Sequence, residues 1–156
     1  MKPIDQIDRK ILKFLQSEGR MSNADLSKRI SLSPTPCLER VRRLEASGYI
    51  EGYYAKLNAT KMKASFLTFM TVKLDQTNEN LFEKFKAAVG GVDEIVECHM
   101  VGGGFDYILK IRTENMEKFR DLMGNQLANL PGILSTSSYF VMEETKNERL
   151  YKIPKS

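Results

Sequence analysis

The chain has 156 residues, of which 42% are hydrophobic and 28% charged, as in an ordinary globular protein. No stretch approaches the roughly 18 to 20 apolar residues that span a bilayer, and the N-terminus carries acids where a signal peptide needs an apolar run. The only cysteines are Cys37 and Cys98, and the only histidine is His99. This inventory excludes a disulfide framework and argues against a zinc site. We therefore expect a protein of the reducing cytoplasm, with no metal and no membrane partner.

The net charge of +4 is unevenly distributed along the chain. Residues 1–63 hold 13 Lys/Arg and 7 Asp/Glu, whereas residues 64–156 hold 11 Lys/Arg and 13 Asp/Glu. A basic first part joined to a mildly acidic second part is typical of nucleic-acid binding confined to one end. Small helical domains are also often basic by chance, so charge alone leaves both interpretations open.

Two helices are predicted near the N-terminus. Residues 5–18 carry apolar side chains at i, i+3, i+4 and i+7, the spacing of an amphipathic helix. Gly19 stands where a left-handed residue commonly ends a helix. Ser22 then begins a short second helix and faces Asp25 in a capping-box-like arrangement. Ser31-Leu32 forms the turn that follows.

A third helix is predicted from the N-cap Ser33 and the first helical residue Pro34 to Gly48. Four residues gather on its core side at about 100° per residue, namely Cys37, Leu38, Val41 and Leu44. Residues 49–56 follow as a β wing. Three helices with a tight turn between the last two describe a winged helix-turn-helix, whose last helix enters the major groove of DNA.

The opposite side of the third helix suits contact with DNA. Ser33, Thr35 and the first-turn amides can donate to phosphate, and arginines reach phosphates or guanine. The alternative is a solvated helix face in a protein-binding module. The predicted DNA-binding residues are Ser33, Thr35, Pro36, Glu39 and Arg43, with Arg40 and Arg42 on the flanks.

The second half alternates strand-like and helix-like segments. Strands are expected over residues 64–74, 92–101, 105–112 and 133–144, and helices over 80–89 and 116–130. The order βαββαβ predicts an α+β chain that ends in a ferredoxin-like sandwich. The first strand is apolar on both alternations, which is typical of burial on both faces. A second copy of the domain is the simplest cover, so we expect a dimer.

Six stretches resemble the Lrp/AsnC, or feast/famine, family of regulators, and most closely its leucine-responsive members. They are residues 7–12, 20–23, 33–45, 97–99, 105–107 and 141–144. The resemblance implies a helix-turn-helix domain over residues 1–49, a wing and hinge strand over 50–63, and a RAM or AsnC-type domain over 64–156. It also implies dimers that assemble further, often into octamers around which DNA wraps.

The same resemblance places an amino-acid effector at the loop from Gly102 to Asp106, between dimers. Glycines let backbone amides approach a carboxylate, and Asp106 can accept an ammonium group. The alternative is a tight hairpin that Asp106 caps, with Cys98 and His99 as packing residues. The implied effector residues are Met100, Gly102, Gly103, Gly104, Asp106, Met116 and Tyr139, with Phe140 and Val141 nearby.

The resemblance implies a sequence-specific transcription regulator of amino-acid metabolism genes, located in the cytoplasm at the nucleoid. Its effector would be leucine, methionine or another small apolar amino acid, with no further cofactor. An enzyme is the rival from another class, but the sequence has no nucleophile–base pair, phosphate-binding glycine motif or carboxylate cluster. A second alternative is a nucleoid-type DNA-wrapping protein with weak sequence preference, which salt dependence and the specificity ratio would distinguish.

Overall fold

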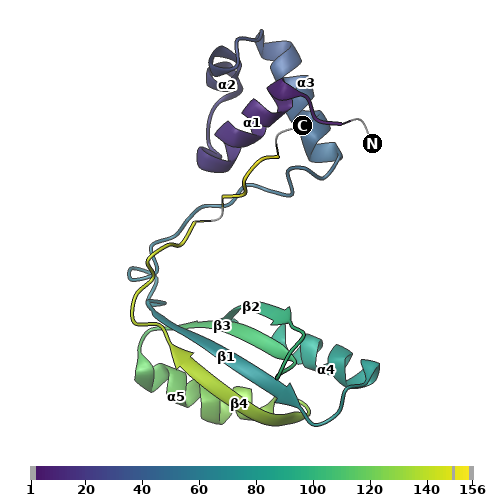
Figure 1. The fold of residues 1–156 in the computed structure, drawn as a ribbon. Helices are drawn as coiled ribbons and strands as arrows, with labels where there is room; N and C mark the ends of the chain where they lie inside the picture. Colours follow the sequence, from purple (N-terminus) through teal and green to yellow (C-terminus); the bar gives the residue numbers. More distant parts are fainter. Residues whose placement is uncertain (1–2, 149, 155–156) are drawn as a thin grey trace. The chain divides into compact units, whose positions relative to one another are not determined.

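The computed structural model describes residues 3–148 and 150–154, which form two compact units (Figure 1). The first unit holds the chain up to Lys56 together with the chain from Lys146 onwards, and the second spans Leu57–Thr145. The C-terminal tail was assigned to the second domain from sequence. In the structure, the side-chain amide of Gln16 bonds to both the N–H and the carbonyl of Tyr151, each at 3.0 Å. These bonds join the tail to the first unit.

The first unit contains the three expected helices, α1 (Gln6–Ser17), α2 (Asn23–Arg29) and α3 (Pro34–Ala46). Asp5 caps α1, and its side chain and that of Asp8 accept each other's backbone N–H in a full capping box. Ser22 caps α2 by accepting from the N–H of Asp25. Local capping chemistry therefore sets where these helices begin, and the predicted starts agree to within a residue.

The core of the first unit is a small apolar cluster between the helices. Its buried members are Ile11, Leu15, Leu26, Ile30, Cys37 and Leu44. The sequence also placed Leu38 on the core side, which is wrong, because Leu38 is 37% exposed and lies outside this cluster. Burial raises the pKa of the Cys37 thiol, as expected for a packing residue.

The structure differs from two local predictions for the first unit. Helix α1 ends through Glu18 at φ −133°, and Gly19 does not take the left-handed conformation; positive φ occurs instead at Ser31 and Gly48. Residues 50–57 carry no strand, although a β wing and hinge strand were expected there. A strand needs a hydrogen-bonded neighbour, and none pairs with this segment in the single chain described.

The second unit is the expected ferredoxin-like sandwich. Its elements are β1 (Phe66–Leu74), α4 (Glu79–Val89), β2 (Ile95–Met100), β3 (Tyr107–Thr113), α5 (Met116–Asn125), the 3-10 turn η1 (Leu127–Asn129) and β4 (Ile133–Phe140). The strands form one antiparallel sheet in the order β2-β3-β1-β4 (Figure 1). The bounds of some elements differ from those predicted, but the predicted fold class is confirmed.

Some bounds differ from those predicted for this unit. The register between β2 and β3 shifts between Ile95 and Glu97, and β2 begins three residues later than predicted. Helix α5 stops at Asn125, directly after Gly124, and the chain continues as η1. Glycine is a poor helix former, which accounts for the early end. Strand β4 stops at Phe140, four residues before its predicted end.

The two faces of the sheet have different environments. One face buries alternate residues such as Met70, Val72, Leu109 and Ile111 against Phe85 of α4 and residues of α5. The other, which we call the outer face, therefore carries the intervening residues. It includes Ile108 and the ion pair of Lys110 with Glu97, at 3.0 Å. The outer face is more polar than the apolar pattern of β1 suggested.

Among the residues described, no helix is both long and apolar enough to cross a membrane.

Candidate DNA-binding surface and effector pocket

The start of α3 is poor in amide donors. Pro34 and Pro36 occupy its first and third positions, and proline has no N–H. Two of the first-turn amides that were expected to donate to phosphate are therefore absent. The side chain of Ser33 makes no capping hydrogen bond, and Ser33 and Thr35 are exposed together with Pro36. Hydroxyl groups are therefore the main donors that this end of the helix offers.

Helix α2 holds the start of α3 in place. The side-chain amide of Asn23 donates to the carbonyl of Pro34 at 2.9 Å. The turn between the two helices contains Ser31 at φ +57°, and the N–H of Leu32 donates to the carbonyl of Ser27 at 2.9 Å. These contacts fix the geometry that a helix-turn-helix needs to present its last helix.

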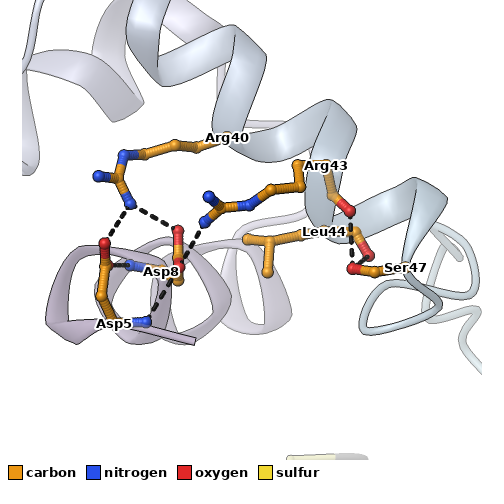
Figure 2. Close-up of polar contacts among 6 residues, drawn as sticks. All are labelled: Asp5, Asp8, Arg40, Arg43, Leu44 and Ser47. Carbon is orange, nitrogen blue, oxygen red and sulfur yellow. Dashed lines mark hydrogen bonds and ion pairs between the residues drawn. The ribbon is translucent and has the colours of Figure 1, made fainter. Parts of the chain in front are cut away.

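Further along α3, the predicted residues separate into two groups. Glu39 and Arg42 are exposed. Arg40 and Arg43 instead reach toward α1, as Figure 2 shows. Sequence periodicity placed Arg43 opposite the core, and its guanidinium group nevertheless bonds to the buried Asp8 at 2.6 Å. The long side chain extends back across the helix surface, which a helical wheel does not represent.

The carboxylates that receive these arginines belong to the capping box of α1 (Figure 2). Arg40 Nη1 lies 2.6 Å from Asp5 Oδ2 and 2.9 Å from Asp8 Oδ1. Desolvation alone would raise the pKa of Asp5, but the hydrogen bonds from the Asp8 N–H and from Arg40 lower it to about 2. Hydrogen bonds to Asp5 and then to Asp8 raise the pKa of Arg40.

The second unit has a small pocket on the outer face of its sheet. Its volume is about 160 Å³. The lining residues come from β1, from the loop before β3 and from β4, namely Thr71, Lys73, Gly104, Phe105, Ser135, Thr136, Ser137 and Tyr139. Of the seven predicted effector residues, Gly104 and Tyr139 line this pocket. It offers one cation, several hydroxyls and two aromatic rings.

Asp106 lies next to this pocket but does not line it. Its N–H donates to the carbonyl of Val72 at 2.9 Å, and its Oδ2 accepts from the N–H of Leu74 at 2.7 Å. Asp106 therefore ties the glycine loop to β1, as the hairpin-capping alternative required. A carboxylate has further acceptor sites, so this contact is compatible with a ligand amine.

The other predicted effector residues are more scattered. Met100 ends β2 and is 52% exposed, whereas Met116 begins α5 and is 41% exposed. Gly103 has φ +154°, which favours glycine, while Gly102 has open space around a Cβ position. None of these four lines the pocket.

Sequence reasoning missed Thr71, Lys73, Ser135 and Ser137. Thr71 pairs with Ser137, and Lys73 with Ser135, across β1 and β4. Part of the signal was available, since these polar residues alternate with buried residues in β1 and with partly buried ones in β4. Their meeting point depended on strand order, which the alternation does not give.

Cys98 and His99 were both expected to be packing residues. Cys98 packs against the core, and burial raises the pKa of its thiol. The prediction is wrong for His99, whose side chain is 62% exposed with Nε2 3.4 Å from Glu97. Across the described residues, no three His, Cys, Asp or Glu side chains are grouped in a way that could hold a metal ion.

A helix-turn-helix unit joined in one chain to a ferredoxin-like unit with its own small pocket defines a class of DNA-binding transcription regulators that carry a separate ligand domain. Residues 4–51 match the winged helix-turn-helix DNA-binding family, and residues 67–151 match the Lrp/AsnC ligand binding domain. The chain belongs to the Lrp/AsnC family of transcription regulators.

Curated relatives and solved structures agree with this assignment. The chain is 53% identical to the leucine-responsive regulatory protein of Salmonella typhimurium and 52% identical to that of Escherichia coli K12. Each match covers 93% of this chain and 88% of the relative. A transcriptional regulator from Neisseria meningitidis, solved with L-methionine, superposes with TM-score 0.89 at 32% identity, covering 94% of this chain and 95% of that one. An AsnC-family regulator from Agrobacterium tumefaciens superposes with TM-score 0.91 at 28% identity, covering 96% and 97%.

Proposed function

We propose that this regulator reads operator DNA with the exposed side of α3 and responds to a small apolar amino acid bound at the pocket of the second unit. The observation that carries the second part is the pocket itself, which places Lys73 beside the glycine loop. Relatives named for leucine response and a neighbour complexed with L-methionine support an amino acid as the effector. Genes of amino-acid metabolism are the corresponding targets.

The proposed DNA contacts come from the exposed residues of α3. Ser33 and Thr35 donate to phosphate through their hydroxyls, and Pro36 adds apolar contact. Glu39 can accept from cytosine N4, and Arg42 can reach phosphate or guanine. Arg40 and Arg43 lie on the same helix, but their guanidinium groups are already bonded to carboxylates of α1.

The proposed effector site combines the pocket with the predicted loop. Lys73 and the amides around Gly102–Gly104 receive the amino-acid carboxylate, and Asp106 receives its ammonium group. Tyr139 and Phe105 contact the side chain, with Met100 and Met116 at the margin. A cavity of roughly 150 Å³ holds a molecule of about the size of benzene. A pocket of about 160 Å³ therefore favours a single small amino acid as the ligand.

We further propose that the chain works as an even-numbered assembly, such as an octamer, at the nucleoid. The family domain supports oligomerisation, and operator half-sites favour paired helix-turn-helix units. The alternative, a DNA-wrapping protein with weak sequence preference, is favoured by the basic first 63 residues. The two functions are distinguished by the ratio of specific to non-specific affinity at fixed salt.

Calorimetric titration with the twenty amino acids tests the effector site. Asp106→Asn keeps a carbonyl oxygen for the Leu74 N–H and removes the charge, so we expect affinity for the best ligand to fall about tenfold or more with unchanged thermal stability. Leu134→Ala, an exposed change outside the pocket, is the matched control. Full affinity in Asp106→Asn would limit Asp106 to holding the hairpin. The absence of binding by any amino acid would contradict the effector proposal.

A further inference from the structure

Asp8 is a charged residue on α1 whose carboxylate is fully buried. Its side chain is 0% exposed, on the helix that also contributes Ile11 and Leu15 to the apolar core of the unit. An ionised carboxylate in such a place is costly unless it is paired and hydrogen-bonded. Asp8 accepts from Arg40 Nη1 at 2.9 Å, from Arg43 Nη2 at 2.6 Å and from the Asp5 N–H at 3.0 Å. Its hydrogen-bonding capacity is therefore directed at α3 and at the start of its own helix.

The two arginines stand one helical turn apart on α3, so a single carboxylate contacts that helix at two levels (Figure 2). Asp5 closes the network by accepting from Arg40 at 2.6 Å and from the Asp8 N–H at 2.8 Å. We call these four residues, Asp5, Asp8, Arg40 and Arg43, the α1–α3 clamp. Two carboxylates and two guanidinium groups cancel in charge. The clamp therefore opposes rotation or sliding of α3 along α1 while adding no net charge toward DNA.

Direct phosphate contact by these arginines is the competing interpretation. Side-chain exposure is 26% for Arg40 and 40% for Arg43, so both retain some access to solvent. If both guanidinium groups left Asp8 for phosphates, however, the buried carboxylate would keep only the Asp5 N–H as a partner, which is strongly unfavourable. Arg42, between them in sequence, is exposed and can meet a phosphate at no such cost.

We propose that Asp8 is a positioning residue for DNA recognition, and that Arg40 and Arg43 support operator binding by holding α3 against α1 rather than by contacting DNA. This inference rests on the proposed recognition surface of α3. It explains an acidic residue at the core of a DNA-binding unit. It also assigns the electrostatic contact with phosphate on this helix to Arg42.

The salt dependence of binding separates positioning from contact, because each phosphate contact adds close to one to the slope of log affinity against log salt. The probe is the duplex that the unsubstituted protein selects from a random-sequence library, titrated from low to moderate salt. Arg42→Ala should lower the slope by about one. Asp8→Asn, Arg40→Ala and Arg43→Ala should each weaken binding by roughly tenfold, comparable to one mismatched base pair, with the slope unchanged.

Two results would overturn the proposal: a slope that falls in Arg40→Ala and Arg43→Ala as it does in Arg42→Ala, or unaltered operator affinity in Asp8→Asn. Helix content by circular dichroism identifies any variant that does not fold. If a variant does not fold, the test uses the unsubstituted protein, in which the rate of modification of each arginine by an arginine-directed dicarbonyl reagent is measured with and without DNA. Arg40 and Arg43 should react slowly with and without DNA, whereas Arg42 should be protected only when DNA is added.

The rates of arginine modification also separate this proposal from the proposed function. If the protein selected no preferred duplex, sequence-specific reading would fail, yet slow reaction of Arg40 and Arg43 in the free protein would still show the clamp. Fast reaction of both in the free protein would contradict the clamp even if operator binding were tight.

Discussion

Arginine side chains on a recognition helix are usually assigned to DNA from their helical position, and Arg40 and Arg43 show what that assignment omits. Their partner Asp8 lies 32 and 35 residues away in sequence. Nothing in the local pattern indicates that a carboxylate on α1 is buried opposite them. The capping box of α1 was open to prediction from Asp5 and Asp8, but its second role required the packing of α1 against α3.

At this scale the charge on Asp5 should contribute to stability in a defined pH window. Its pKa is about 2 in the folded chain against 3.8 as a reference, so its stabilising contribution is complete above pH 4 and is lost as pH falls toward 2. Asp5→Asn retains a good N-cap and removes the charge facing Arg40. We expect the variant to be less stable near pH 6, with a difference that shrinks between pH 4 and 2.

Thermal unfolding of both proteins at several pH values, followed by helix circular dichroism, measures this difference. The Asp5 side chain is 49% exposed, so solvent screening keeps the expected loss below about 1 kcal/mol. Adding 1 M salt at pH 6 should reduce the difference, because salt screens an exposed pair. A difference that stayed constant from pH 6 to 2 would show that the charge on Asp5 is not responsible.

At the scale of elements, caps and periodicity predicted every helix and strand of the second unit and all three helices of the first. Such features are local, and the structure confirms them. The wing was not confirmed because a strand depends on a partner, and Leu38 was misplaced because three helices enclose only part of the apolar side of α3. The pocket residues Lys73 and Ser135 were missed because strand order brings them together.

Two glycines give a matched test of how the elements of the second unit pack. Gly132 precedes β4 with φ +69°, and a Cβ there would lie 2.5 Å from Leu81 Cδ1 on α4. Gly124 lies in α5, and apart from its chain neighbours and the backbone of its own helix, a Cβ there would meet no atom within 4 Å. We expect Gly132→Ala to destabilise the chain by roughly 1 kcal/mol or more, and Gly124→Ala to stabilise it by about 0.5–1 kcal/mol. Urea unfolding measures both, and shifts of the same sign would contradict the packing described.

At the scale of the whole molecule, the chain separates its tasks between two units of different charge. The basic residues lie mainly in the sequence of the first unit, and the ligand-domain match lies almost entirely in the second. The C-terminal tail is an exception to this division along the sequence. It follows the second unit in the chain, but its Tyr151 bonds to Gln16 of α1 in the first unit. Sequence assigned this tail to the second domain instead, because the tail has no helical or strand pattern that would link it to α1 and its contacts with Gln16 are made by backbone atoms of Tyr151.

The outer face of the sheet should be the surface through which two copies associate. Ile108 lies near its centre, paired with Thr71 of β1 on one side and His99 of β2 on the other. A carboxylate placed there would be buried between copies, where desolvation is costly and the neighbouring Lys110 and His99 already contact Glu97. We therefore expect Ile108→Glu to shift the protein from an even-numbered assembly toward the 17.8 kDa chain, measured by light scattering at micromolar concentration.

Gln6→Glu adds the same charge at an exposed position of the first unit and should leave the assembly intact. Circular dichroism establishes whether Ile108→Glu still folds, and Thr71→Arg on the neighbouring strand repeats the test with the opposite charge. If both outer-face variants kept the full assembly mass, the copies would have to associate through another surface. A dominant 17.8 kDa species in the unsubstituted protein would contradict the expectation of a dimer itself.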